Sequence, residues 1–155
     1  MKADSAFDPV KAAKKLLREA RSGALATLMP GSGDPYCSLV NVATGPDGAP
    51  LLLLSKLAVH TKNLLADNRV SLMLDERKAG DPLEGARVML MGTIAANGDA
   101  KLRAAYLRRH PDAASYAQFA DFAIYRMEIS RAHLVAGFGR IVDLAAKDIL
   151  ADVAE

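Results

Sequence analysis

The stretch LLLLSKLAVHTKNL, residues 51–64, says most about how this chain folds. Its four consecutive leucines have no polar alternation, which predicts a β-strand covered on both faces. The strand ends at Ser55 and Lys56, a short loop follows, and Thr61 and Lys62 open a short helix that Asp67 and Asn68 end. The sequence therefore predicts a buried strand that leads directly into a polar helix start.

This strand end and helix start also bring together groups that suit an anion. Two hydroxyls, two ammonium groups and the backbone N–H groups of a helix start fall within residues 55–62. Helix-start amides and the helix dipole favour negative charge, and lysines add point charges, so the pattern suits a phosphate monoester. Spacing alone leaves a second interpretation open, in which Thr61 only caps the helix and Lys56 and Lys62 are solvated.

Short apolar runs separated by turns rich in Gly, Pro and Asp flank this stretch on both sides. Such runs predict antiparallel strands, which we place at 24–29, 36–43, 51–55, 69–75, 86–96 and, as the last strands, 122–129 and 132–138. Gly92 lies inside one run and predicts a bulge or sharp bend. Periodicity predicts helices at 9–21, opened by Asp8 and Pro9, and at 99–109, then a helical segment to about residue 119 and a terminal helix at 144–154. The predicted fold is α+β, a six-stranded antiparallel β-barrel with short flanking helices.

Composition narrows the class of protein. A chain of 155 residues with 51% hydrophobic residues predicts a single domain over 1–155, with no additional C-terminal domain. The net charge of +2 gives no argument for nucleic-acid binding. The sequence has no uncharged run of 18 residues, so we expect no membrane-spanning helix. Cys37 is the one cysteine, which excludes an intramolecular disulfide; we expect it to be a small buried residue. With no apolar leader at the N-terminus, we expect a cytoplasmic protein.

Motifs along most of the chain resemble a known superfamily. In order they are ALATL (24–28), PYCSLVNVA (35–43), LLLLSKLAVHTKNL (51–64), DNRVSL (67–72), RVMLMG (87–92), YLRRHP (106–111), DFAIYRM (121–127) and AHLVAGFGR (132–140). Over residues 9–143 the sequence is similar to the split-barrel FMN-binding superfamily of pyridoxamine 5′-phosphate oxidase. Within it, the chain most resembles the subgroup related to the HugZ haem-utilisation proteins.

The resemblance implies a fold, a cofactor and a set of residues. It implies a homodimer of split barrels with FMN at the subunit interface, and an FMN-dependent oxidoreductase acting on an unknown small molecule. Arg87 falls where the oxidases usually carry a glutamine near the flavin ring. The other cofactor-binding residues implied are Ser38, Leu39, Val40, Asn41, Leu54, Ser55, Lys56, Thr61 and Lys62.

The alternative function on the same fold is haem binding or haem utilisation. Haem-handling relatives hold iron through a histidine, which makes His133 and His60 the candidate ligands. The oxidases carry a C-terminal Arg/His-rich segment that grips the substrate phosphate, and this pattern is missing from residues 125–144. We therefore do not expect a true pyridoxamine 5′-phosphate oxidase. For His133, the sequence also allows an ordinary hydrogen-bonded residue of the core or of an interface.

Overall fold

A computed structural model describes residues 6–77, 79–137 and 139–150. Its helices are α1 (Pro9–Glu19), α2 (Val59–Ala66), α3 (Ala100–Arg109) and α4 (Ala146–Leu150), with short 3-10 turns at Pro82–Glu84 and Pro111–Ser115. Its strands are β1 (Ser22–Leu28), β2 (Pro35–Asn41), β3 (Ala43–Thr44), β4 (Pro50–Ser55), β5 (Arg69–Asp75), β6 (Ala86–Ala96), β7 (Phe122–Ala136) and β8 (Ile141–Ala145).

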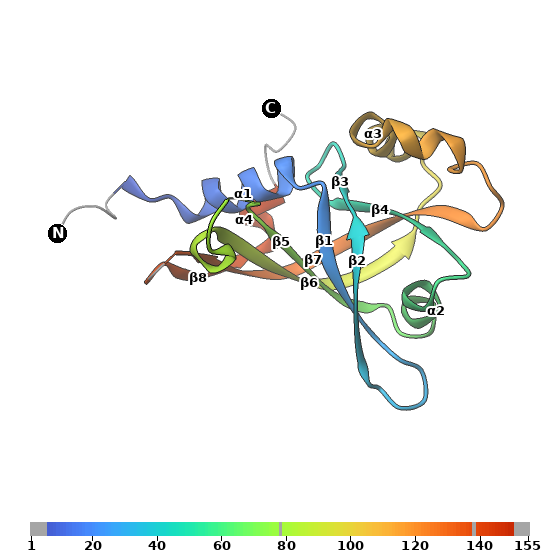
Figure 1. The fold of residues 1–155 in the computed structure, drawn as a ribbon, viewed down its shortest axis with the longest axis horizontal. Coiled ribbons are helices and arrows are strands. Elements are labelled where there is room, and N and C mark those ends of the chain that lie inside the picture. The colour runs from blue at the N-terminus through green and yellow to red at the C-terminus, as the bar shows by residue number, and fades with distance from the viewer. Residues whose placement is uncertain (1–5, 78, 138, 151–155) are drawn as a thin grey trace.

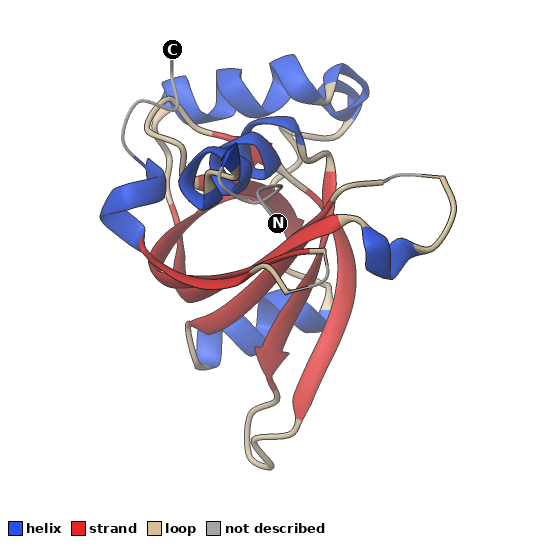
Figure 2. Ribbon diagram, turned by 90° about the vertical axis from the view of Figure 1, so that its left-hand side faces the viewer, coloured by secondary structure: helices blue, strands red, loops and turns tan. Residues whose placement is uncertain are grey.

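All eight strands belong to one antiparallel sheet. Its order is β2-β1-β5-β6-β7-β4-β3, and β8 pairs with the far end of β7. The sheet curls around an interior, and Figure 2 shows helices lying over its rim. In Figure 1, α1 and α4 lie together at one end, and α2 and α3 lie toward the other. This is the α+β split-barrel architecture that the sequence predicts, with eight strands in place of six.

The core forms where strand alternation points inward. Leu52 and Leu54 of β4 join the main cluster inside the barrel, together with Leu16 and Leu17 of α1. Leu51 and Leu53 point the other way and pack in a second cluster beneath α3. The predicted burial of this strand on both faces is therefore confirmed. Burying each of these leucines stabilises the fold by about 1.5–3 kcal/mol relative to leaving it in water.

Several predicted boundaries need correction. The predicted strand at 36–43 is two strands, because the chain leaves the β1 edge after Asn41 and pairs with β4 instead. The two runs at 122–129 and 132–138 form one strand, β7, since β6 pairs with it across both runs, from Tyr125 to Ala136. The helical segment expected to reach residue 119 is a 3-10 turn ending at Ser115, and the side chain of Phe119 is exposed.

The C-terminal prediction also differs from the structure. Residues 141–145 form β8, which takes up the first two residues of the helix predicted at 144–154, and α4 covers only Ala146–Leu150. Residues 151–154 of that predicted helix lie outside the described residues. Cys37 is exposed rather than buried, because β2 is an edge strand and Cys37 is on its solvent-facing side.

The predicted irregularity at Gly92 is confirmed and fixes how the two longest strands align. Met91 pairs with Arg131 while Gly92 pairs with Ile129, so β7 has one extra residue at this point. A Cβ on Gly92 would lie 1.9 Å from the backbone oxygen of Glu128. The close approach of the two backbones therefore requires glycine.

Candidate functional site

The predicted site residues fall into two separate regions of the chain. Lys56 follows the end of β4, where Ser55 pairs with Phe122 at the start of β7. Arg87 pairs with Val135 at the opposite end of β7. Because Val135 is thirteen residues beyond Phe122 on a strand that rises about 3.3 Å per residue, the regions are roughly 40 Å apart along β7. Within one chain, Arg87 does not meet the predicted phosphate-binding residues.

The first region is the junction between β4 and α2. The Ser55 hydroxyl donates to Oδ2 of Asp121 at 2.7 Å and accepts from the backbone N–H of Leu57 at 3.1 Å. Lys56 and Lys62 are exposed. This junction thus combines two solvated ammonium groups with an aspartate carboxylate, which opposes an anion.

Helix α2 begins two residues earlier than predicted, at Val59. Its N-cap, Ala58, has no side chain that can accept from the first-turn amides, and no acceptor is recorded for those of residues 59–61 among the described residues. Thr61 does not cap the helix. Its side chain is completely buried, and its Oγ1 has no hydrogen-bond partner in the described structure. The helix start therefore offers backbone donors, while the Thr61 hydroxyl is turned away from solvent.

His60 contacts the strand predicted to run beside a cofactor. Its Nδ1 lies 3.3 Å from the Ser38 hydroxyl, and burial lowers its pKa, which keeps the imidazole neutral at pH 7. On β2, Ser38 and Val40 share the inward face, whereas Leu39 and Asn41 are exposed on the other. Leu54 points into the main core. The structure thus joins His60 to Ser38 but separates the four predicted β2 residues onto two faces.

The second region lies on the outer face of the sheet, opposite the core. Strand pairing aligns one residue from each of six strands in a row, which we call the outer row: Leu39, Ala24, Met73, Met89, His133 and Asp143. Leu39 is 72% exposed and Met73 is 36% exposed. The outer row is therefore an apolar strip open to solvent, with a histidine and an aspartate at one end.

His133 is held in one orientation by its neighbour on β8. Its Nδ1 lies 2.7 Å from Oδ1 of Asp143. A carboxylate accepts only, so Nδ1 carries the proton when the imidazole is neutral, and Nε2 keeps its lone pair. A histidine whose other nitrogen is fixed in this way is the usual arrangement at metal centres in proteins.

Two arginines flank His133 on the same face. Arg131 lies two residues before it on β7 and is exposed. Arg87 lies beside Val135 and donates from Nη1 to the backbone oxygen of Leu83 at 3.0 Å. The site therefore combines an oriented imidazole, an apolar surface and two guanidinium groups.

Sequence reasoning found His133 and Arg87 but missed their companions. Asp143 lies just before the predicted terminal helix at 144–154 and was assigned to no strand, so its pairing with His133 was not predicted. Met73, Met89 and Arg131 lie on strands that were predicted, but their common face depends on the register across the Gly92 bulge. No local motif carries that register.

Comparison with known proteins agrees with this architecture. The family model described as "CREG, beta-barrel" matches residues 5–150. The non-canonical heme oxygenase HOZ, chloroplastic, of Arabidopsis thaliana is 36% identical over 137 residues, which cover 84% of this chain. The match covers only 41% of that relative's length.

Two solved structures show how far the likeness extends. A heme binding protein from Mycobacterium smegmatis is 32% identical with a TM-score of 0.87, over 94% of this chain and 61% of its own. A Clostridium acetobutylicum protein of the pyridoxinephosphate oxidase family, related to general stress protein 26, is 16% identical with a TM-score of 0.68. That match covers 92% of this chain and 99% of the other, and it shows the fold alone. The chain belongs to the CREG beta-barrel family, within the FMN-binding split-barrel superfamily that the sequence resembles.

Proposed function

We propose that this protein binds haem on the outer row and serves haem utilisation, with Nε2 of His133 as the iron ligand. The heme oxygenase from Arabidopsis and the heme binding protein from Mycobacterium smegmatis support this alternative over a flavin-dependent oxidoreductase. The observation that carries the proposal is the 2.7 Å contact between His133 and Asp143. In the neutral imidazole it leaves the lone pair on Nε2, and the carboxylate fixes the orientation of the ring and makes the histidine a stronger ligand.

The residues around His133 suit the rest of a haem. Met89 is directly opposite His133 and Met73 is next to it, so the strip beside the ligand is apolar and polarisable. Arg87 and Arg131 are placed to pair with the two propionates, since guanidinium groups bind carboxylates in a bidentate manner. Bound haem would supply an iron centre able to react with dioxygen once reduced by an external donor.

The outer face of a single sheet covers only one side of a planar ligand. The His133 side chain is 37% exposed, and that of Asp143 is 90% exposed. Leu39, at one end of the row, and Ile141, two residues before Asp143 on β8, are both exposed apolar residues. A second copy of the chain, docked through the same face, would cover the other side of the haem and bury these residues. The proposal thus includes a homodimer with the ligand at its interface.

The test is a haemin titration of the purified protein followed by its Soret band. We expect saturable binding that His133→Ala weakens at least tenfold. His60→Ala is the matched control, because His60 is the other candidate ligand and lies on α2 with its Nδ1 against Ser38. Loss of haem binding in His60→Ala, with none in His133→Ala, would contradict the assignment.

FMN remains a second candidate, carried by the start of α2. The uncapped amides of residues 59–61 and the ammonium groups of Lys56 and Lys62 suit a phosphate, as the sequence predicts. The Asp121 carboxylate beside Ser55 and the burial of Thr61 Oγ1 count against a tight site. If FMN is the ligand, the double variant Lys56→Ala/Lys62→Ala abolishes FMN binding, and haemin binding does not depend on it.

A further inference from the structure

A cavity of about 710 Å³ lies beneath α1, on the other side of the barrel wall from the outer row. Its walls come from α1, from the ends of β5 and β6 that a loop joins, and from the turn between β7 and β8. Small-molecule sites in proteins have volumes of roughly 300–1,000 Å³. The cavity is therefore large enough to hold a small organic ligand, and neither proposed cofactor site uses it.

Small side chains create this space. Ala12 and Ala20 line it from the α1 side, and Ala86 and Ala136 line it from the sheet, where they pair directly across β6 and β7. All four are partly buried and pack against the main core. Gly137 also lines the cavity, and a Cβ placed on it would meet no atom within 4 Å. The floor is thus apolar; Phe7 and Leu16 also line the cavity, and the Arg140 guanidinium lies over the Phe7 ring at 4.8 Å from its centroid.

The charges at the mouth divide by side. On the β5 side, Asp75 pairs with Arg77 at 2.8 Å, and the Glu76 carboxylate accepts from the backbone N–H of Ala86 at 2.7 Å. On the α1 side, Lys15 and Arg21 line the mouth together with one acid, Glu19. Asp75 and Glu76 are thus occupied within the protein, and Glu84 is a further acid of the lining between β5 and β6; on the α1 side the two cations outnumber the one acid.

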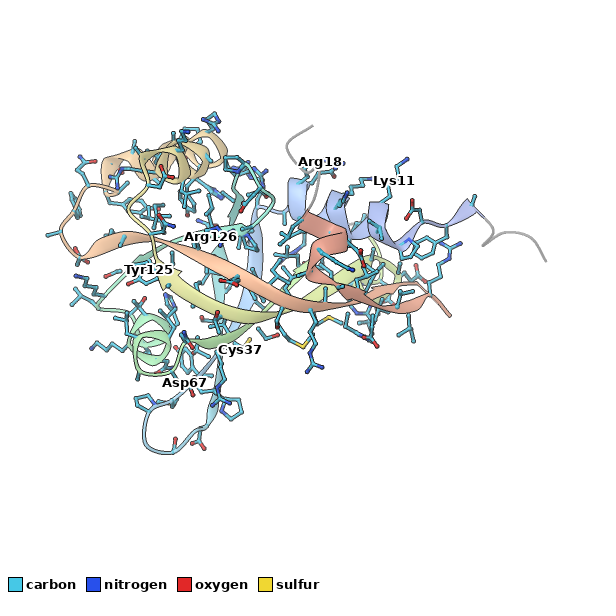
Figure 3. All side chains as sticks on the ribbon, turned by 180° about the vertical axis from the view of Figure 1, so that it is seen from behind. Lys11, Arg18, Cys37, Asp67, Tyr125 and Arg126 are labelled. Atoms are coloured by element: carbon cyan, nitrogen blue, oxygen red, sulfur yellow. The ribbon has the colours of Figure 1, made fainter. Side chains whose placement is uncertain are left out.

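Basic residues in and around α1 add positive charge on this side of the cavity. The helix carries four basic residues and one glutamate, and Figure 3 shows Lys11 and Arg18 on its side away from the sheet. Arg21 lies close enough to Arg109 and His110 that its charge, after burial, helps lower the pKa of both. Cations so close together attract an anion.

We propose that this cavity, the α1 cavity, binds an amphiphilic organic anion. Lys15 and Arg21 pair with its carboxylate or sulfonate, and the alanine floor receives its aromatic or short acyl body. The site is distinct from the outer row, so it stands or falls independently of haem binding at His133.

The test uses the fluorescent anion 8-anilinonaphthalene-1-sulfonate, with decanoate as competitor. We expect one saturable site whose dye is displaced by decanoate. Ala136→Leu fills the floor and should raise the dissociation constant at least tenfold. Ala12→Leu fills the cavity from the helix, where leucine is well tolerated, and should act in the same direction. Circular dichroism and thermal unfolding establish that each variant is folded.

Charge variants and an outer-row variant locate the dye. Lys15→Gln should raise the dissociation constant roughly three- to tenfold, since exposed charge pairs contribute modestly. Lys11→Gln removes the same charge from the same helix, but Lys11 does not line the cavity, so the dissociation constant of the dye should not change. The proposal is overturned if neither leucine variant weakens binding, or if Met73→Ser on the outer row weakens it as much as Ala136→Leu.

Discussion

Replacing Gly92 with alanine tests whether the bulge between β6 and β7 sets the architecture of the outer face. The new Cβ would lie 1.9 Å from the Glu128 oxygen, 2.9 Å from the Glu128 carbonyl carbon and 3.1 Å from the Ile129 Cα. All three are backbone atoms, so no side chain can rotate to relieve the overlap. Gly92 does not have a positive φ, so backbone preference is not the cause of the expected effect.

The cost follows from what must move. Relieving the overlap requires β6 and β7 to separate at the bulge, on strands that pair along most of their length. Overpacking in a well-packed region costs about 1–3 kcal/mol, and more where backbone must shift. We expect the free energy of unfolding to fall by about 3 kcal/mol. For a chain of this size, that lowers the melting temperature by about 6–12 °C.

Thermal unfolding followed by circular dichroism measures this effect. Gly98→Ala is the matched control, because a Cβ there meets no atom within 4 Å and its φ is not positive. We expect that change to be neutral or to stabilise by about 0.4–1 kcal/mol through the unfolded chain. If Gly92→Ala melts within 2 °C of the wild type, the steric account of the bulge is wrong.

Three further predictions address the core, the site and pH. Leu52→Ala removes a side chain with no exposed surface, so urea denaturation should show a loss of about 2–5 kcal/mol. Asp143→Asn replaces the acceptor of the Nδ1 proton of His133; haemin should bind more weakly, with a changed reduction potential, and an unaltered potential would contradict the role given to Asp143. Burial lowers the pKa of His110, whose Nε2 lies 2.6 Å from the backbone oxygen of Val42. The unfolded chain therefore takes up this proton near pH 6.5 and the folded chain does not, so the free energy of unfolding falls as the pH drops from 7 to 5, less steeply in His110→Gln.

The parts of the fold that the sequence predicts are those in which local pattern and packing agree. The leucines at 51–54 have no polar alternation, and both faces of β4 are covered. Asp8 accepts from the backbone N–H of Lys11 and Pro9 opens α1, as expected of a helix start. A glycine at position 92, inside an apolar strand, predicts a bulge or sharp bend, and the register between β6 and β7 shifts at that residue.

Prediction failed where pairing between distant segments decides the structure. Residues 144–150 contain alanine, leucine and lysine, which favour a helix, yet Leu144 lies in β8 because β7 offers an open edge. The same pairing sets Asp143 beside His133. Cys37 has a small apolar side chain, but its exposure depends on β2 lying at the edge of the sheet. Neither the pairing of Asp143 with His133 nor the exposure of Cys37 can be predicted from the local sequence.

The measurement that tests the central claim most directly is chemical rescue of His133→Gly. Haemin is titrated into this variant with and without added imidazole, and the Soret band and the low-energy visible bands are recorded. We expect weak binding without imidazole, and return of the wild-type spectrum when imidazole occupies the space left by the side chain. If His133→Gly binds haemin with the wild-type affinity and spectrum in the absence of imidazole, His133 is not the iron ligand and the outer row is not the haem site.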